Sequence, residues 1–271
     1  MNLHLLQTGT VEIKRAQQQG KGGARLLNIF LDKEWTPPLP IYAWAIAHPE
    51  GVIVVDTGMS SRYQERGYLA AWQVYYRNVR FHVAPHQEIN AQLQNIGIKT
   101  DDVRTVILTH LHSDHADGIA HFPKSEIWIH PQEYAAAQGF GGQMNGYLSQ
   151  HFPAWLKPKP IAFAQEKFGA FNSSCRVTKA GDVIVVPTYG HTPAHVSVIV
   201  QTNDICYFLA GDTSYSQDLL RAKKIDGVSP NAAQALQTME TILEFARTMP
   251  TVYLPAHDPD NPRRIAARET L

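Results

Sequence analysis

Val106-Ile-Leu-Thr109-His110-Leu-His112-Ser-Asp114-His115 is the stretch of sequence from which the rest of the chain can be interpreted. An apolar run typical of a buried strand ends at Leu108, and three histidines and one aspartate follow within six positions. Imidazole and carboxylate groups at this density are typical of a metal site rather than of an ordinary polar loop. We therefore expect a metal centre at the end of this strand.

The spacing within the stretch predicts two pairs of ligands. His110 and His112 are two residues apart, so on an extended segment both side chains project to the same face and can share one ion. Asp114 and His115 follow a predicted bend, after which they can reach a second point nearby. Nitrogen and oxygen donors without cysteine suit Zn²⁺ best, with Fe, Mn, Co or Ni as alternatives.

Composition excludes several classes of partner. Lys plus Arg and Asp plus Glu number 24 each, so the formal net charge is zero and neither nucleic acid nor an anionic membrane is expected to bind. Cys175 and Cys206 are far apart, which favours free thiols over a disulfide framework. The first residues lack a basic head followed by an apolar segment, and no long apolar run occurs. We expect a cytoplasmic protein without a membrane partner.

The 271 residues contain no repeat and no clear linker, so a single domain over 1–271 is expected. Residues 10–40 have glycine and proline clusters that predict a loop-rich region. Residues 60–82 are rich in aromatic and basic groups, which fit either a surface patch or a pocket wall. Residues 139–178 combine glycines, prolines and aromatics. A surface excursion with a small satellite core is the favoured interpretation of this segment, and a lid over the site is the alternative.

Periodicity predicts strands alternating with helices. The expected strands cover residues 3–8, 41–47, 52–55, 103–108, 126–129, 183–186, 196–201, 205–209 and 251–254. Helices are expected over 85–96, from His130-Pro131 through Ala137, and over 230–249, with a helical turn at 117–121. We expect His130 to pack or cap rather than to bind metal.

The last expected helix has a predicted cap and a predicted buried face. Ser229 is positioned to cap its N-terminus. The apolar stripe is expected to comprise Leu236, Met239, Leu243 and Ala246.

Further ligand-type residues stand just beyond other strand ends. His191, Asp212 and His257 each follow a short apolar run, and strand ends that meet at one sheet edge would bring such side chains together. Asp56 ends an earlier strand before Thr57-Gly58. It fits a turn former and a support for a nearby metal ligand equally well.

Taken together, these motifs resemble those of the metallo-β-lactamase fold superfamily, in the expected order and over nearly the whole chain. The resemblance is carried by Thr109-His110-x-His112-x-Asp114-His115, Gly190-His191-Thr-Pro-x-His195, Gly211-Asp212-Thr213, the late His257 and the early Asp56-Thr57-Gly58. It implies an α+β fold, a four-layer αββα sandwich, with a dinuclear metal site at the sheet edge.

The resemblance also implies a role for each residue. His110, His112 and His191 would bind one ion, Asp114, His115 and His257 would bind the other, and Asp212 would bridge the two. Asp56 and His195 would support these ligands from outside the metal shell. Ala116-Asp117-Gly118 departs from the glycine pair of many members, which is expected to affect the packing of the turn more than the ligands.

A site for two neighbouring divalent ions indicates hydrolysis as the reaction. Such a pair can hold a bridging water as hydroxide, polarise a carbonyl or phosphoryl oxygen and stabilise the charge that develops during attack. Asp114 could pass the proton of the water to the departing oxygen.

Tyr215 narrows the substrate class. In Gly211-Asp212-Thr-Ser-Tyr215 it looks like the tyrosine that N-acyl homoserine lactonases of this superfamily place beside the metals. There a phenol can hydrogen-bond the lactone carbonyl or the ring oxygen. A packed core tyrosine is the alternative. The leading hypothesis is a lactonase that acts on a small-molecule lactone or ester.

Other activities stay open. The same metals support phosphotriester and aryl ester hydrolysis. Thioester hydrolysis of the glyoxalase type is less favoured, because no basic cluster suited to glutathione is present. A mono-iron thiol oxygenase and a binding-only site are disfavoured by the complete set of seven ligands, and a nuclease by the neutral charge balance. The oligomeric state stays open, with a homodimer among the options.

Overall fold

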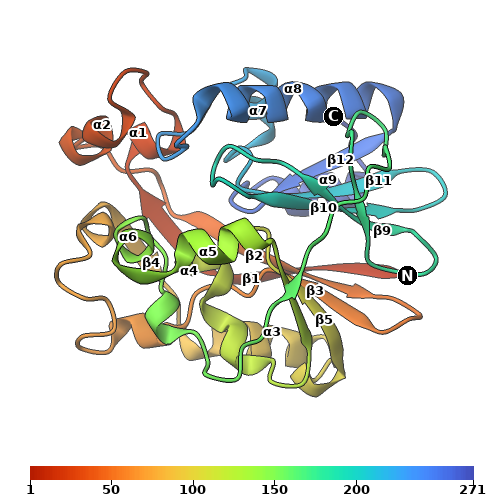
Figure 1. Ribbon diagram of the computed structural model, residues 1–271, viewed down its shortest axis with the longest axis horizontal. Helices are drawn as coiled ribbons and strands as arrows, with labels where there is room; N and C mark the ends of the chain where they lie inside the picture. Colours follow the sequence, from red (N-terminus) through yellow and green to blue (C-terminus); the bar gives the residue numbers. More distant parts are fainter. The chain divides into compact units, whose positions relative to one another are not determined.

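The computed structural model describes residues 1–271 (Figure 1) and consists of two compact units. The first unit comprises Met1–Ile13 and Trp35–Pro160, and the second comprises Lys14–Glu34 and Ile161–Leu271. Each unit contains one β-sheet and its own helices, so the architecture is α+β. The segment 139–178 crosses the boundary between the two units. Its suggested role as a lid stays a prediction, as does the single-domain assignment.

The first unit contains a seven-stranded sheet with the order β4-β1-β2-β3-β5-β6-β7. Its strands are β1 (Asn2–Ile13), β2 (Leu39–Ala47), β3 (Val52–Val55), β4 (Val79–His82), β5 (Val103–Ile107), β6 (Glu126–Ile129) and β7 (Lys159–Pro160). Strands β4, β1, β2 and β3 pair antiparallel, whereas β3, β5, β6 and β7 run parallel. Because β3 and β5 are parallel neighbours, Asp56 and the motif after β5 emerge at the same edge.

Short helices surround this sheet. They are α3 (Ile89–Asn95), α4 (Ser113–Ala116), α5 (Pro131–Ala137) and α6 (Gly139–Met144), with 3₁₀ helices at 61–64, 74–78, 85–87, 100–102, 117–121 and 149–151. Ile89 and Leu93 of α3 are buried in the same core as Val54 and Val106 of the sheet. Helix α3 therefore covers one face of the sheet (Figure 1).

The second unit contains a five-stranded sheet with the order β12-β11-β10-β9-β8. Its strands are β8 (Cys175–Arg176), β9 (Val183–Pro187), β10 (Val196–Gln201), β11 (Cys206–Gly211) and β12 (Thr251–Pro255). Only β11 and β12 are parallel. The helices of this unit are α1 (Arg15–Gln18), α2 (Arg25–Leu31), α7 (Gln217–Arg221), α8 (Ala232–Thr248) and α9 (Asn261–Ala267).

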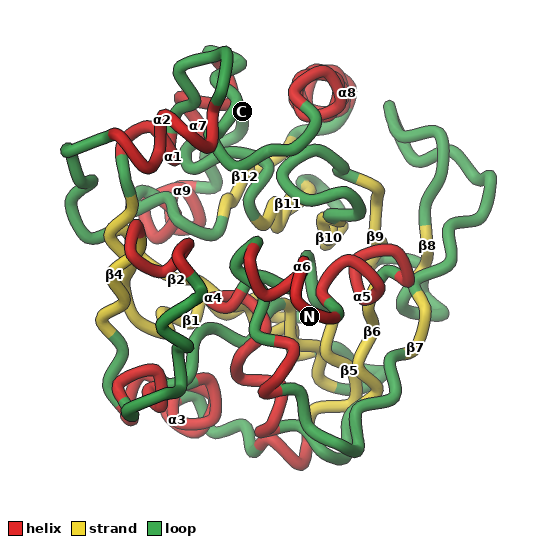
Figure 2. The backbone as a smooth tube through the Cα atoms, turned by 60° about the vertical axis from the view of Figure 1, so that its left-hand side comes forward, coloured by secondary structure: helices red, strands yellow, loops and turns green.

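Helix α8 runs along one face of the second sheet, and Figure 2 shows it end-on above β10 and β11. The residues that it buries are Ala235, Met239, Ile242 and Phe245. Of the predicted stripe, Met239 is fully buried and Leu243 is partly buried against the same core, whereas Leu236 and Ala246 are only partly buried. The helix packs on Phe208 and Tyr253 of the sheet, and this contact selects the buried face.

The predicted cap of α8 was also wrong. Asn231 caps the helix, its side chain accepting a hydrogen bond from the backbone N–H of Gln234 at 3.1 Å. Ser229 instead donates its hydroxyl to Asp226 at 2.8 Å. By contrast, His130 caps α5 as expected, because its Nδ1 accepts from the backbone N–H of Gln132 at 3.2 Å.

Most predicted strands are confirmed within one or two residues. The prediction of a loop-rich region over 10–40 was wrong in part, because β1 extends to Ile13 and two short helices follow. Both cysteines are free thiols, as expected. Burial raises the pKa of the Cys206 thiol to about 11. None of the helices combines the length and apolar character that a membrane crossing requires.

Gly58 provides a test of the packing at the end of β3. Its φ is +70°, and an added Cβ would lie 2.4 Å from Thr8 Oγ1. Gly67 has a φ of +87° but open space around it. Gly67→Ala should therefore cost about 1 kcal/mol of unfolding free energy from backbone strain. Gly58→Ala should cost roughly 1–3 kcal/mol more from the clash. Urea unfolding followed by circular dichroism measures both, and equal costs would contradict this account.

Candidate metal centre

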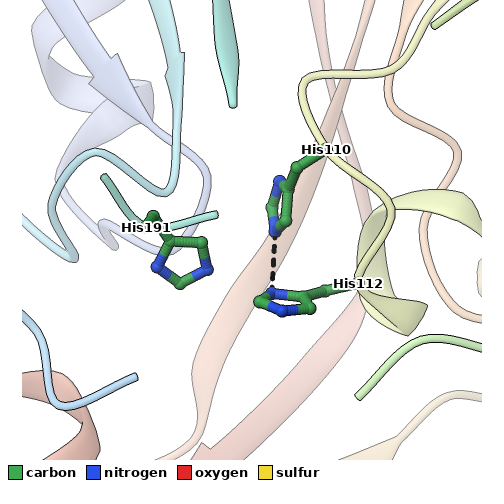
Figure 3. A group of neighbouring side chains, drawn as sticks. All are labelled: His110, His112 and His191. Atoms are coloured by element: carbon green, nitrogen blue, oxygen red, sulfur yellow. Dashed lines mark hydrogen bonds between the residues drawn. The ribbon is translucent and has the colours of Figure 1, made fainter. Parts of the chain in front are cut away.

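The first set of candidate ligands follows β5. His110 and His112 are both buried, and Nε2 of His110 lies 3.0 Å from Nδ1 of His112 (Figure 3). The two rings are nearly perpendicular, at 84°. The structure therefore confirms that the spacing of two residues turns both imidazoles toward one point.

Asp114 and His115 lie in the helical turn α4, which begins directly after His112. The backbone N–H groups of His115 and Ala116 donate to the carbonyl of His112 at 3.0 and 3.1 Å. This turn is the bend expected from the sequence. Candidate ligand atoms of Asp114 and His115 lie within 4.8 Å of each other, as do those of His110 and His115.

Asp56 holds this first set together from the end of β3. Its Oδ1 accepts a hydrogen bond from the backbone N–H of Thr109 at 2.8 Å, and its Oδ2 lies 2.9 Å from Nδ1 of His115. Asp56 has a φ of +60°, so it also turns the chain. The two functions that the sequence left open are thus combined in one residue. With Nδ1 in this contact, Nε2 is the nitrogen of His115 that could bind a metal.

The turn after His115 packs closely on the end of β3. An added Cβ on Gly118 would lie 2.3 Å from the carbonyl oxygen of Thr57, so glycine is required there. Asp117 accepts hydrogen bonds from the Tyr68 hydroxyl at 2.8 Å and from the backbone N–H of Ser60 at 3.1 Å. Burial raises the pKa of the Asp117 carboxyl to about 6. Asp117 and Gly118 thus fix the packing of the turn.

The second set of candidate ligands lies in the second unit and comprises His191, Asp212 and His257, all buried. Asp212 lies between the two histidines. Its Oδ2 is 3.5 Å from Nε2 of His191, and its Oδ1 is 3.4 Å from Nε2 of His257. Two atoms bound at about 2.1 Å to one tetrahedral ion are about 3.4 Å apart. These distances therefore fit a carboxylate that shares a different ion with each imidazole.

Asp226 orients His191 and was not predicted from the sequence. Its Oδ2 lies 3.0 Å from Nδ1 of His191, which leaves Nε2 to face Asp212. The Asp226 carboxylate is held in turn by the backbone N–H groups of Val228 and Ser229 at 2.8 and 2.7 Å. The loop of His191 also needs Gly190, because an added Cβ would lie 2.4 Å from Cα of Ala235 in α8.

His195 lies behind Asp212. Its Nε2 accepts a hydrogen bond from the backbone N–H of Asp212 at 3.0 Å, and its Nδ1 lies 2.9 Å from the Thr188 hydroxyl. Both ring nitrogens have these contacts within the second unit. His195 is therefore placed to support Asp212 from outside the metal shell, the role that the resemblance implied.

Tyr215 is buried against a candidate ligand. Its ring stacks on His257 with a centroid distance of 5.4 Å and an interplanar angle of 22°. Its hydroxyl accepts a hydrogen bond from Nε2 of Gln17 at 3.4 Å. Gln17 belongs to the region predicted to be loop-rich, and no sequence pattern indicated this contact.

Glu133 of α5 is another residue that the sequence did not reveal. It is buried, and its Oε1 accepts hydrogen bonds from the backbone N–H of Leu111 at 3.2 Å and from the Tyr147 hydroxyl at 3.1 Å. It therefore holds the peptide between His110 and His112. Its position three residues after the capping His130 carries no signal for this contact.

The donor set passes a simple test of fit to divalent metals. The donors are five imidazoles and two carboxylates, and six of the seven side chains are buried, Asp114 being partly exposed. Buried imidazoles whose Nδ1 faces a carboxylate are typical of metal ligands, because this contact fixes the tautomer and the ring orientation. The chemistry suits Zn²⁺ and related ions.

Known proteins match most of this chain. Residues 36–257 match the family model of the metallo-beta-lactamase superfamily. The chain is 26% identical over 269 residues to the N-acyl homoserine lactonase AttM of Agrobacterium fabrum, covering 96% of this chain and 94% of that protein. It is 29% identical over 192 residues to an N-acyl homoserine lactonase of Bacillus cereus, covering 66% of each.

Solved structures show the same fold. An N-acyl homoserine lactone hydrolase with N-hexanoyl-L-homoserine bound at its catalytic metal centre aligns with a TM-score of 0.79 at 21% identity, over 96% of this chain and 94% of that chain. The dizinc quorum-quenching lactonase AidC aligns with a TM-score of 0.64 at 15% identity, over 95% and 87%. The predicted fold class is thereby confirmed. The chain belongs to the metallo-beta-lactamase superfamily and is a metal-dependent hydrolase of that family.

Proposed function

We propose that this protein is a dinuclear lactonase that opens N-acyl homoserine lactones or related lactones by hydrolysis. The observation that carries the proposal is Asp212, whose two oxygens face His191 and His257 at 3.5 and 3.4 Å, as a carboxylate shared by two ions would. The relatives named N-acyl homoserine lactonases supply the substrate class.

The two ligand sets would jointly bind two ions. We assign His110, His112 and His191 to one ion, Asp114, His115 and His257 to the other, and Asp212 to both. Asp56, Asp226 and His195 would orient ligands from outside the metal shell. The contact of Nδ1 with a carboxylate in His115 and His191 supports this division, because it leaves Nε2 of each ring for the metal.

Two bound divalent ions would lower the pKa of a water between them and polarise the lactone carbonyl. In the overall reaction, water adds to the carbonyl carbon and the bond from that carbon to the ring oxygen breaks. Asp114 is partly exposed, unlike the other six candidate ligands. It would accept the proton of the attacking water and pass it to the departing ring oxygen, which becomes the hydroxyl of the product.

Tyr215 would act on the substrate through its hydroxyl. The stack on His257 keeps the phenol beside a candidate ligand, and the contact with Gln17 orients the oxygen. A phenol at this position could donate a hydrogen bond to the lactone carbonyl or to the ring oxygen. A phenol that donates to the charge developing on this oxygen would accelerate ring opening.

Aromatic residues in the first unit would contact the apolar part of the substrate. The rings of Tyr75 and Tyr147 lie 6.5 and 5.1 Å from that of His112. Trp72 and Phe140 are exposed and stack at 5.1 Å. These residues come from the segments 60–82 and 139–178. The position of Tyr75 and Tyr147 beside His112 supports an acyl-binding wall.

Promiscuous phosphotriester and aryl ester hydrolysis is the second candidate activity, since the same metals polarise a phosphoryl or an ester oxygen. Zinc as the native metal, a cytoplasmic location and a homodimer stay predictions.

A substrate panel tests the proposal. Acyl homoserine lactones, simple lactones, aryl esters and phosphotriesters would be compared in a pH-indicator assay at equal enzyme concentration. Acyl homoserine lactones should have the highest kcat/KM, by roughly tenfold or more over the aryl esters, because the acyl chain adds apolar contacts. If a phosphotriester is the best substrate, phosphotriester hydrolysis replaces lactone hydrolysis as the favoured activity.

Metal content tests the dinuclear centre. Elemental analysis of the purified protein should give close to two divalent ions per chain. Chelator treatment should abolish lactone hydrolysis, and Zn²⁺ added back should restore it, because both ligand sets need an ion to function. A firm stoichiometry of one iron would instead support a thiol oxygenase.

Tyr215→Phe tests the role of the phenol. Removing one positioned donor should lower kcat for lactone opening by about 10- to 100-fold, with metal content unchanged. Tyr207→Phe in β11 is the matched control, because it removes a hydroxyl from the same unit without altering the candidate site. Unaltered turnover in the Tyr215 variant would remove its assigned role.

A further inference from the structure

Helix α9 holds the chain on both sides of His257. On one side, Nδ2 of Asn261 donates to the carbonyl of Pro255 at 2.6 Å. On the other side, Nη1 of Arg264 lies 2.8 Å from Oδ2 of Asp258. All three side chains are almost fully buried, with Asn261 at 0%, Asp258 at 2% and Arg264 at 3% exposure. The backbone of Ala256 and His257 is thus fixed at both ends by one helix.

Asp258 also connects this segment to the loop of Asp212. Its Oδ2 accepts a hydrogen bond from the backbone N–H of Gln217 at 2.9 Å, and its Oδ1 accepts from the backbone N–H of Asp260 at 3.0 Å. Gln217 is the first residue of α7, five residues after Asp212. One carboxylate therefore ties the two loops that carry Asp212 and His257.

Stability alone does not account for the buried pair of Arg264 and Asp258. Replacing a buried ion pair by apolar residues of similar volume is often neutral or stabilising. Apolar side chains at positions 258 and 264 could not supply the directional hydrogen bonds through which Asp258 connects both loops. The 3.4 Å distance between Asp212 and Nε2 of His257 depends on where those two loops lie, whereas His191 is oriented separately by Asp226.

We propose that Arg264 and Asn261 are positioning residues that set the affinity for the metal ion bound by His257. The inference rests on the proposed dinuclear function. The side chains of both residues form their hydrogen bonds and ion pairs with residues outside the candidate ligand set. They act through the backbone of 255–258, which presents Nε2 of His257 at 3.4 Å from Asp212.

Metal competition against a chromophoric chelator, with Zn²⁺ as the probe, tests the inference on the full chain. Arg264→Met should weaken binding of one of the two ions by about 10- to 100-fold and leave the other unchanged. Arg263→Met is the matched control, since Arg263 is the neighbouring residue of α9 and its side chain is 57% exposed. Arg264→Lys should restore part of the affinity.

A double-mutant cycle separates positioning from general destabilisation. In the His257→Ala background, Arg264→Met should cause no further loss of metal affinity, because its effect passes through His257. Asn261→Ala removes only a neutral hydrogen bond and provides a milder variant with the same expected direction. If Arg264→Met does not fold, Asn261→Ala takes its place in the double-mutant cycle.

Three results would overturn the inference. The first is unchanged metal affinity in Arg264→Met, or in Asn261→Ala if Arg264→Met does not fold. The second is an equal loss of affinity for both ions. The third is a full additional loss of affinity in the His257→Ala background. A wild-type protein that binds fewer than two ions would instead contradict the proposed function. The two failures are therefore distinguishable.

Discussion

The first ligand set depends on the buried carboxylate of Asp56. It accepts from the backbone N–H and the hydroxyl of Thr109 and contacts Nδ1 of His115. Hydrogen bonds to a charged group are each worth about 1.5–3 kcal/mol, so losing this carboxylate would release both the motif strand and the helical turn. The positive φ of Asp56 places the carboxylate there, and the close packing of Gly58 on Thr8 accommodates the turn.

The second unit also orients its candidate ligands, but with different residues. Asp226 holds His191 as Asp56 holds His115, and in both cases the carboxylate contacts Nδ1. His195 fixes the backbone of Asp212, and α9 fixes the backbone around His257. Each candidate ligand of the second unit is thus oriented by a residue outside the candidate ligand set. Such preorganisation supports metal affinity and, with Tyr215 stacked on His257, the proposed hydrolysis.

Local sequence patterns predicted most helices and strands. Where a prediction failed, contacts that form only in the folded chain are the cause. The strand at 126–129 and the cap at His130 follow from residues that are neighbours in sequence, and both are confirmed. The buried face of α8 was misplaced, because packing on Phe208 and Tyr253 decides which side of an apolar helix turns inward. Ser229 met the requirements of a cap, but α8 begins only at Ala232, so Asn231 caps it, while the Ser229 hydroxyl donates to Asp226.

The sequence by itself determined the candidate ligands, the order of the motifs and the family, because ligand types and strand periodicity are local properties. Tertiary structure decided which side chains support those ligands. Asp226, Glu133, Gln17 and Arg264 have no motif of their own. Asp226 lies 35 residues from His191 and Gln17 lies 198 residues from Tyr215, so their partners are set by how the chain folds back on itself. A hydrogen bond at such a separation depends on three-dimensional proximity, which no local pattern encodes.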